Sequence, residues 1–167
     1  MSTVGAAAVG SQRRADGLNE VPAMSMDTTA GMRVTHLDAD RFRVDVRGHT
    51  LTVDQPVDAG GEDTAPTPTE LFVAGLATCV AFYAGRYLTR HGLPTDGLAI
   101  TTSYTMASRP ARVGAVRLEL AVPVGVPADR QDALLAVASH CTVHNTLTTA
   151  PDVTIMLSTR PDEPRTV

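Results

Sequence analysis

The sequence predicts an α+β fold in which strands and helices form separate groups along the chain. Segments with alternating apolar and polar residues come in two runs, as expected for half-buried strands. A long apolar segment with helix signals at both ends separates the two runs. Since strands and helices do not alternate, antiparallel sheets packed against helices are favoured over a parallel α/β sheet.

Composition indicates one folded domain with a tail at each end. The chain has 167 residues, of which 43% are hydrophobic and 19% are charged, proportions typical of a globular protein. Residues 1–30 are rich in alanine, glycine, serine and threonine without a sustained period, so we expect a flexible tail there. We place the folded domain at residues 31–160 and a polar C-terminal tail at residues 161–167.

Charge and hydropathy give no reason to expect a nucleic-acid or membrane partner. The formal net charge of −4 offers no basic surface for a phosphate backbone. We see no apolar run that reaches the roughly 18 residues of a membrane span, and the N-terminus lacks the basic start of a secretory signal. We therefore expect a cytoplasmic protein, in which two cysteines are more often catalytic, metal-binding or inert than a permanent disulfide.

The first run of strands predicts an antiparallel meander. Residues 32–37, 42–46 and 50–54 alternate apolar and polar side chains, and turn-like residues separate them. The segment 58–66 is polar and contains Gly60-Gly61, which predicts a loop before the long helix. A glycine pair alone is too weak a signal for a phosphate-binding loop.

The long helix has recognisable signals at its start and its end. Thr67 suits the N-cap, Pro68 the first helical position and Glu70 the third, which together make a capping box. Apolar or small residues then continue to Leu88, and Gly92 suits the C-cap after two basic residues. Nearly all of this segment is apolar, so we expect a helix buried on most sides.

The elements after this helix complete the domain. We predict strands at 98–106 and 113–122 with a hairpin turn at 109–112, an amphipathic helix at 128–139, a short helix at 143–147 and a closing strand at 153–157.

The two cysteines lie in distinctive surroundings. Cys79 would lie in the middle of the long helix on the same face as Phe72 and Leu76, where a buried structural cysteine is the simplest interpretation. A reactive role would require a charged group near the sulfur. Glu70 lies nine residues earlier, too far along the helix to touch Cys79 directly, but it can hold an arginine from another segment beside the sulfur.

The second cysteine raises the alternative of a metal site. His140, Cys141 and His144 lie close together in sequence, and with Cys79 they would form a Cys2His2 set of the type that binds zinc. The spacing is not that of a zinc finger, and adjacent residues on a helix point apart. Two thiols far apart in sequence also suit a redox pair that meets only in the folded protein.

At these residues the chain resembles the OsmC/Ohr family of thiol-dependent peroxidases. The matching segments are Gly60-Gly61, residues 66–72, residues 74–79 and residues 141–147, and the order of predicted elements matches from about Met32 to Thr159. The resemblance implies an α+β fold that forms an intertwined homodimer, with Cys79 on a central helix near the subunit interface.

The resemblance also implies roles for individual residues. Cys79 would be the peroxidatic cysteine and Cys141 the resolving cysteine. The family's catalytic glutamate position is Thr69 here, so Glu70 beside it is the candidate carboxylate. Arg47 is our candidate for the catalytic arginine, with Arg41 and Arg43 as alternatives. Family members also continue the second motif Cys-Pro, whereas Thr142 follows Cys141 here.

The leading hypothesis is reduction of an alkyl or fatty-acyl hydroperoxide by a two-cysteine cycle, with no bound cofactor or metal. By resemblance, an external dithiol such as a lipoylated protein would reduce the disulfide. The alternatives are a thiol-based redox sensor or small-ligand-binding protein on the same fold, and the zinc site.

Overall fold

The structure, a computed structural model, describes residues 31–157 and confirms the α+β class. The tails predicted at residues 1–30 and 161–167 lie outside the described residues. The elements in chain order are β1 (Met32–His36), β2 (Phe42–Val46), β3 (His49–Val53), the 3-10 turn η1 (Val57–Ala59), α1 (Pro68–Arg90), β4 (Ala99–Ser108), β5 (Ala111–Ala121), α2 (Ala128–Ser139) and α3 (Thr142–Thr148).

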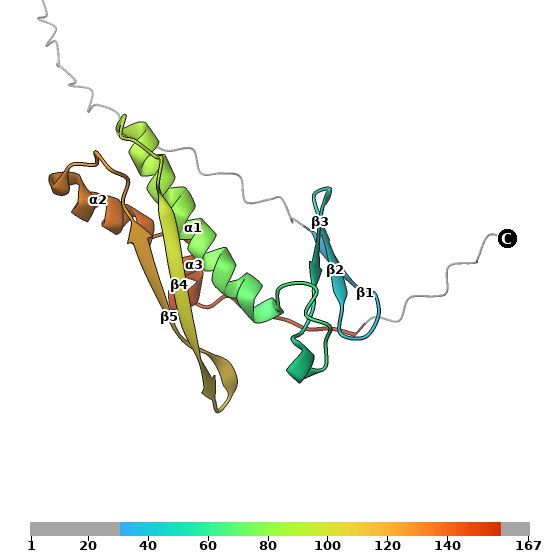
Figure 1. Cartoon of the computed structure of the whole chain (residues 1–167). Coiled ribbons are helices and arrows are strands. Elements are labelled where there is room, and N and C mark those ends of the chain that lie inside the picture. The colour runs from blue at the N-terminus through green and yellow to red at the C-terminus, as the bar shows by residue number, and fades with distance from the viewer. Residues whose placement is uncertain (1–30, 158–167) are drawn as a thin grey trace, which may run out of the picture.

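The strands form two antiparallel sheets that lie at different places along α1. The first sheet has the order β1-β2-β3, and the second is the β4–β5 hairpin. Figure 1 shows the three-stranded sheet beyond the N-terminal end of α1, while β4 and β5 run beside the helix together with α2 and α3. The main core is therefore built by α1, the hairpin and the two later helices.

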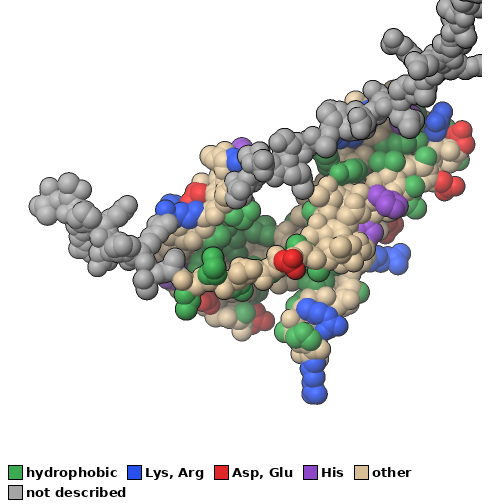
Figure 2. Space-filling view, turned by 180° about the vertical axis from the view of Figure 1, so that it is seen from behind, with side chains coloured by type: hydrophobic (Ala, Val, Ile, Leu, Met, Phe, Trp, Pro, Cys, Tyr) green, Lys and Arg blue, Asp and Glu red, His purple; other side chains and the backbone are tan. Residues whose placement is uncertain are grey.

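The three-stranded sheet has an apolar face that the other residues of the described range 31–157 do not cover. Val34 lies opposite Val44, which lies opposite Leu51, so these side chains form a row across one face. Met32, Val34, Phe42 and Leu51 are all exposed. Figure 2 shows apolar side chains gathered over this part of the molecule. We call this surface, defined by those four residues, the sheet face.

The start of α1 is as predicted. Thr67 is the N-cap, with its hydroxyl accepting the Glu70 backbone N–H at 3.1 Å. The Glu70 carboxylate accepts the Thr67 backbone N–H at 2.8 Å, which completes the capping box. Pro68 occupies the first helical position, where its missing N–H is not needed.

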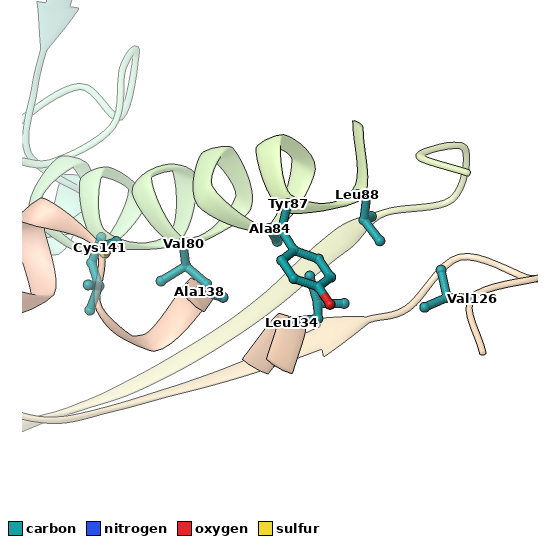
Figure 3. Close-up of a cluster of buried hydrophobic side chains, with 9 residues drawn as sticks. Val80, Ala84, Tyr87, Leu88, Val126, Leu134, Ala138 and Cys141 are labelled. Carbon is teal, nitrogen blue, oxygen red and sulfur yellow. The ribbon is translucent and has the colours of Figure 1, made fainter. Parts of the chain in front are cut away.

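The core lies along one face of α1. Val80, Ala84 and Leu88 of this helix pack against Leu134 and Ala138 of α2, and Figure 3 shows these side chains pointing toward one another. Leu88 and Leu134 are almost completely buried.

The other face of α1 differs from the prediction. Phe72 and Phe82 are 42% and 56% exposed, so the helix is not buried on most sides. By length and composition alone, α1 is also long and apolar enough to cross a membrane. The expectation that no apolar segment reaches the length of a membrane span is therefore wrong. In this fold α1 instead supplies one face of the protein core.

The predicted closing strand at 153–157 does not form. These residues carry no strand pairing, and Ile155 and Leu157 are 91% and 102% exposed. Alternating side chains fit a strand, but a strand also needs a neighbour to pair its backbone groups. Within residues 31–157 this segment has no such neighbour.

Candidate functional site

The fold brings Cys79 and Cys141 together from positions far apart in sequence. Cys79 lies in the middle of α1 and is half-buried. It packs against the core cluster of which Cys141 is a member. Both are free thiols. The two sulfurs therefore lie at the edge of one core, and Cys79 is the more accessible of the two.

Cys141 is held at the start of α3. It is the N-cap residue, with the extended backbone (φ −69°, ψ 155°) that caps adopt, and its Sγ accepts the His144 backbone N–H at 3.4 Å. Its exposed fraction is 0%, and Figure 3 shows it at one end of the core cluster. Only His140 separates it from the end of α2, so the position of both helices determines where its sulfur lies.

The surroundings of Cys141 favour its neutral thiol. Burial raises the pKa of Cys141, the His144 N–H lowers it, and the neighbouring Cys79 thiol raises it again. Together these effects raise the pKa of Cys141 above 9.0, the ordinary value for a thiol. A buried, protonated thiol is a poor first nucleophile. It is nevertheless well placed to react with an oxidised sulfur beside it.

A hydrogen bond between α1 and α3 joins the segments that carry the two cysteines. The Tyr83 Oη and Thr142 Oγ1 atoms lie 2.9 Å apart. Tyr83 is one helical turn after Cys79, and Thr142 directly follows Cys141. We call this contact the Tyr83–Thr142 clamp. No motif in the sequence predicts this contact; its signal is the four-residue spacing between Cys79 and Tyr83.

Glu70 lies on a different side of α1 from Cys79. Nine residues make about two and a half turns, which places the two side chains on opposite sides of the helix. Glu70 instead borders a hollow beside β4, together with Thr102 and Tyr104. Its carboxylate is engaged in the capping box.

The candidate arginines lie in β2 or directly before and after it, in the three-stranded part of the fold. Arg47 is exposed in the β2–β3 turn, with a positive φ of 48°. Arg41 pairs with Asp38 at 2.5 Å and with Glu62 at 3.3 Å. Arg43 pairs with Asp45 at 2.9 Å. No contact between these arginines and Cys79 is present in residues 31–157, so the structure does not join them to the thiol pair within one chain.

A buried aspartate organises the loop that contains Gly60-Gly61. Asp54 has an exposed fraction of 0% and accepts hydrogen bonds from the Gln55 N–H, the Thr64 N–H and the Thr64 hydroxyl, at 2.7–2.9 Å. These bonds, led by those from Thr64, lower the pKa of Asp54 to about 2. Gly61 lies so close to Asp54 and Gln55 that a side chain would collide with them. The glycine pair therefore has a structural reason in this loop.

The zinc alternative finds no support in the geometry. Across the part of the chain that the structure describes, no group of three or more His, Cys, Asp or Glu side chains comes together to hold a metal.

An apolar cavity lies near the segments that hold the two cysteines, although neither cysteine lines it. It has a volume of about 380 Å³ and lies between α1, β5, α2 and α3. Leu76 and Val80, which flank Cys79 on α1, line one side, and His144 supplies a polar group. A cavity of this kind suits a small, mainly apolar ligand.

Comparison with known proteins places this arrangement in a family. The family model described as OsmC-like protein matches residues 60–156, more than half of the chain and both cysteine segments. The chain belongs to the OsmC family. None of the curated proteins compared with it matches.

Solved structures share the fold of this OsmC family member at low identity. A Psychrobacter arcticus protein, provisionally described as an osmotic stress induced and detoxification response protein, is 22% identical with a TM-score of 0.67, over 74% of this chain and 91% of that one. An OsmC-like protein from Mycoplasma pneumoniae is 15% identical with a TM-score of 0.65, over 75% and 91%. An organic hydroperoxide resistance protein OsmC from Legionella pneumophila is 20% identical with a TM-score of 0.56, over 73% and 92%.

Proposed function

We propose that this protein is a thiol-dependent peroxidase that reduces organic hydroperoxides through Cys79 and Cys141. The observation that carries the proposal is the pairing of a half-buried thiol with a fully buried one at the edge of a shared core. Membership of the OsmC family supports it, since one structural neighbour is an organic hydroperoxide resistance protein. Cys79 is the accessible sulfur and therefore the one that meets the peroxide.

The catalytic cycle consumes one hydroperoxide and one external dithiol, which returns both cysteines to thiols. The Cys79 thiolate attacks the distal peroxide oxygen, the O–O bond breaks, and the alkoxide takes a proton and leaves as an alcohol. Cys79 is then a sulfenic acid. The Cys141 sulfur attacks it, the S–S bond forms, and the hydroxyl group leaves as water. A dithiol reduces this disulfide by exchange and is itself oxidised. A lipoylated protein in the cytoplasm remains our expected reductant.

The surroundings of the thiol pair favour an alkyl or fatty-acyl hydroperoxide over hydrogen peroxide. The cavity near the segments that hold the two cysteines is lined mainly by leucine, valine and alanine side chains. Burying the alkyl part of a substrate there contributes binding energy in proportion to its apolar area, roughly 25 cal/mol per Å². Hydrogen peroxide has no apolar part to bury.

A homodimer is part of this proposal. The sheet face leaves Met32, Val34, Phe42 and Leu51 exposed, and α1 leaves Phe72 and Phe82 exposed. Monomers rarely expose apolar patches above roughly 300–600 Å². A second copy would cover these surfaces and offer the segment at 153–157 a strand to pair with. Light scattering at micromolar concentration tests this, and a monomer would contradict it.

The catalytic roles of Glu70 and Arg47 remain predictions for the assembled protein. Glu70→Gln keeps a capping side chain and removes the charge, and Arg47→Gln removes the candidate guanidinium. Each is expected to lower peroxide turnover less than loss of Cys79. If both variants turn over at the wild-type rate, neither residue activates the thiol.

Steady-state turnover tests the proposed function. Purified protein with a dithiol should consume cumene hydroperoxide faster than hydrogen peroxide. Cys79→Ser should abolish consumption, and Cys141→Ser should permit one oxidation of Cys79 that ends as sulfinic acid. Thr78→Ser, a matched change next to Cys79, should leave turnover unchanged. If Cys79→Ser retains full activity, or wild type shows none, the redox sensor or small-ligand-binding function would replace the peroxidase.

A further inference from the structure

Two arginines of α1 lie on the same side of the helix as Cys79. Tyr83, Arg86 and Arg90 follow Cys79 by four, seven and eleven residues. At 3.6 residues per turn, these four side chains lie within roughly 60° of one another around the helix axis. The C-terminal half of α1 therefore carries two positive charges on the helix face that also carries Cys79.

These arginines line a hollow on the surface of the protein that can hold a ligand. It has a volume of about 370 Å³ and is lined by Tyr83, Arg86, Tyr87, Arg90, His91 and Val137. All but Val137, which comes from α2, belong to α1 or its C-cap. Tyr83 also forms the Tyr83–Thr142 clamp, so the hollow begins beside the segment that holds Cys141.

Neither arginine is neutralised by an acidic side chain of the described chain. The ion pairs found in residues 31–157 belong to Arg41 and Arg43, in the three-stranded part of the fold. The Arg86 guanidinium lies 5.4 Å from the centre of the Phe82 ring, a cation–π contact that keeps it beside the helix without removing its charge. Both arginines are exposed in the single chain, where an external anion can reach them.

We propose that Arg86 and Arg90 bind a carboxylate on the hydroperoxide substrate while its peroxide group lies at Cys79. The inference rests on the proposed peroxidase function and narrows the substrate to carboxylate-bearing organic hydroperoxides. Seven and eleven residues correspond to about 10 and 16 Å along the axis of α1. Arginine side chains on a helix lean toward its N-terminus, which brings both guanidinium groups closer to the thiol.

The arginines act on binding and orientation and take no part in the covalent steps. A guanidinium matches a carboxylate with two parallel hydrogen bonds, a geometry that a neutral ester cannot fully use. If the arginines hold the carboxylate at a fixed distance from Cys79, the peroxide group of the substrate lies at the Cys79 sulfur. The bonds that form and break are those of the cycle described above.

A comparison of an acid with its ester tests the proposal. The substrates are linoleic acid hydroperoxide and its methyl ester, with a neutral dithiol held in excess so that the peroxide half of the cycle is measured. Wild type should show a lower KM for the acid than for the ester. Arg86→Gln combined with Arg90→Gln should lower kcat/KM for the acid by about tenfold, the order of loss expected for hydrogen bonds to a charged group. The ester should change less than about twofold.

Removing two arginines elsewhere in the protein distinguishes carboxylate binding by Arg86 and Arg90 from a general effect of lost positive charge. Arg117→Gln combined with Arg130→Gln removes the same charge from β5 and α2, and should leave the acid-to-ester ratio at the wild-type value. Equal losses on acid and ester, or no loss on either, would overturn the proposal. Absence of turnover with both substrates would instead defeat the proposed peroxidase function.

Discussion

The Tyr83–Thr142 clamp leads to a prediction about the second step of the cycle. The hydrogen bond of 2.9 Å joins α1, one turn beyond Cys79, to the first residue of α3, whose N-cap is Cys141. Tyr83→Phe removes the hydroxyl and keeps the ring. The variant should leave the first oxidation of Cys79 unchanged and slow the formation of the disulfide.

The size of the effect follows from the strength of one hydrogen bond. Both partners are neutral and partly exposed, so the net contribution is about 1 kcal/mol. That energy corresponds to a factor of about five in the fraction of molecules with α3 docked against α1. We therefore expect disulfide formation to slow by up to about fivefold in Tyr83→Phe, and the sulfenic acid to persist correspondingly longer.

Rapid quenching after hydroperoxide addition, followed by mass spectrometry, measures both steps. With excess peroxide, Tyr83→Phe should accumulate more Cys79 sulfinic acid than wild type, because the sulfenic acid waits longer for Cys141. Thr142→Val should give the same result, and the double variant no larger effect. Tyr104→Phe on β4 is the matched control. A slower first oxidation in Tyr83→Phe, or an unchanged sulfinic acid yield, would contradict a role for this hydrogen bond in disulfide formation.

Three further predictions concern the segments that position the site. Thr67→Ala removes the N-cap hydroxyl of α1 and should lower the free energy of unfolding by about 1 kcal/mol in urea titrations, whereas Thr67→Ser should not. Gly61→Ala should lower the thermal midpoint, because its Cβ would collide with the Gln55 carbonyl oxygen. The pKa of Asp54 is lowered from 3.8 to about 2, mainly by the Thr64 N–H and hydroxyl, so its contribution to stability is complete above about pH 4 and is lost as the pH falls through about 2. Acid titration followed by circular dichroism should show this loss, and Asp54→Asn should flatten stability over that interval.

Local sequence signals predicted most elements because their causes are local. The capping box at Thr67 depends on residues within one turn, and the helix at Ala128–Ser139 follows from side-chain periodicity. The strand at 153–157 failed because pairing depends on a neighbour that periodicity does not identify. The same limit explains the exposed Phe72 and Phe82, since apolar composition does not show which face of a helix another element covers.

The candidate site was partly predictable for a related reason. The position of Cys79 within the long helix followed from the sequence, whereas its meeting with Cys141, the N-cap of α3, is found in the structure. The Tyr83–Thr142 clamp joins residues 59 positions apart, a contact that no local pattern indicates. The spacing of Arg86 and Arg90 from Cys79 can be read from the sequence, but the hollow that they line forms only when α2 packs beside α1.

Disulfide mapping after a single oxidation shows whether Cys79 and Cys141 form a redox pair. Wild-type protein is treated with one equivalent of cumene hydroperoxide, and the thiols are blocked before proteolysis and mass spectrometry. We expect a peptide pair joined through Cys79 and Cys141, with the mass of two hydrogen atoms lost. Sulfinic acid on Cys79 together with an unreacted Cys141 thiol, or two unmodified thiols, would contradict it.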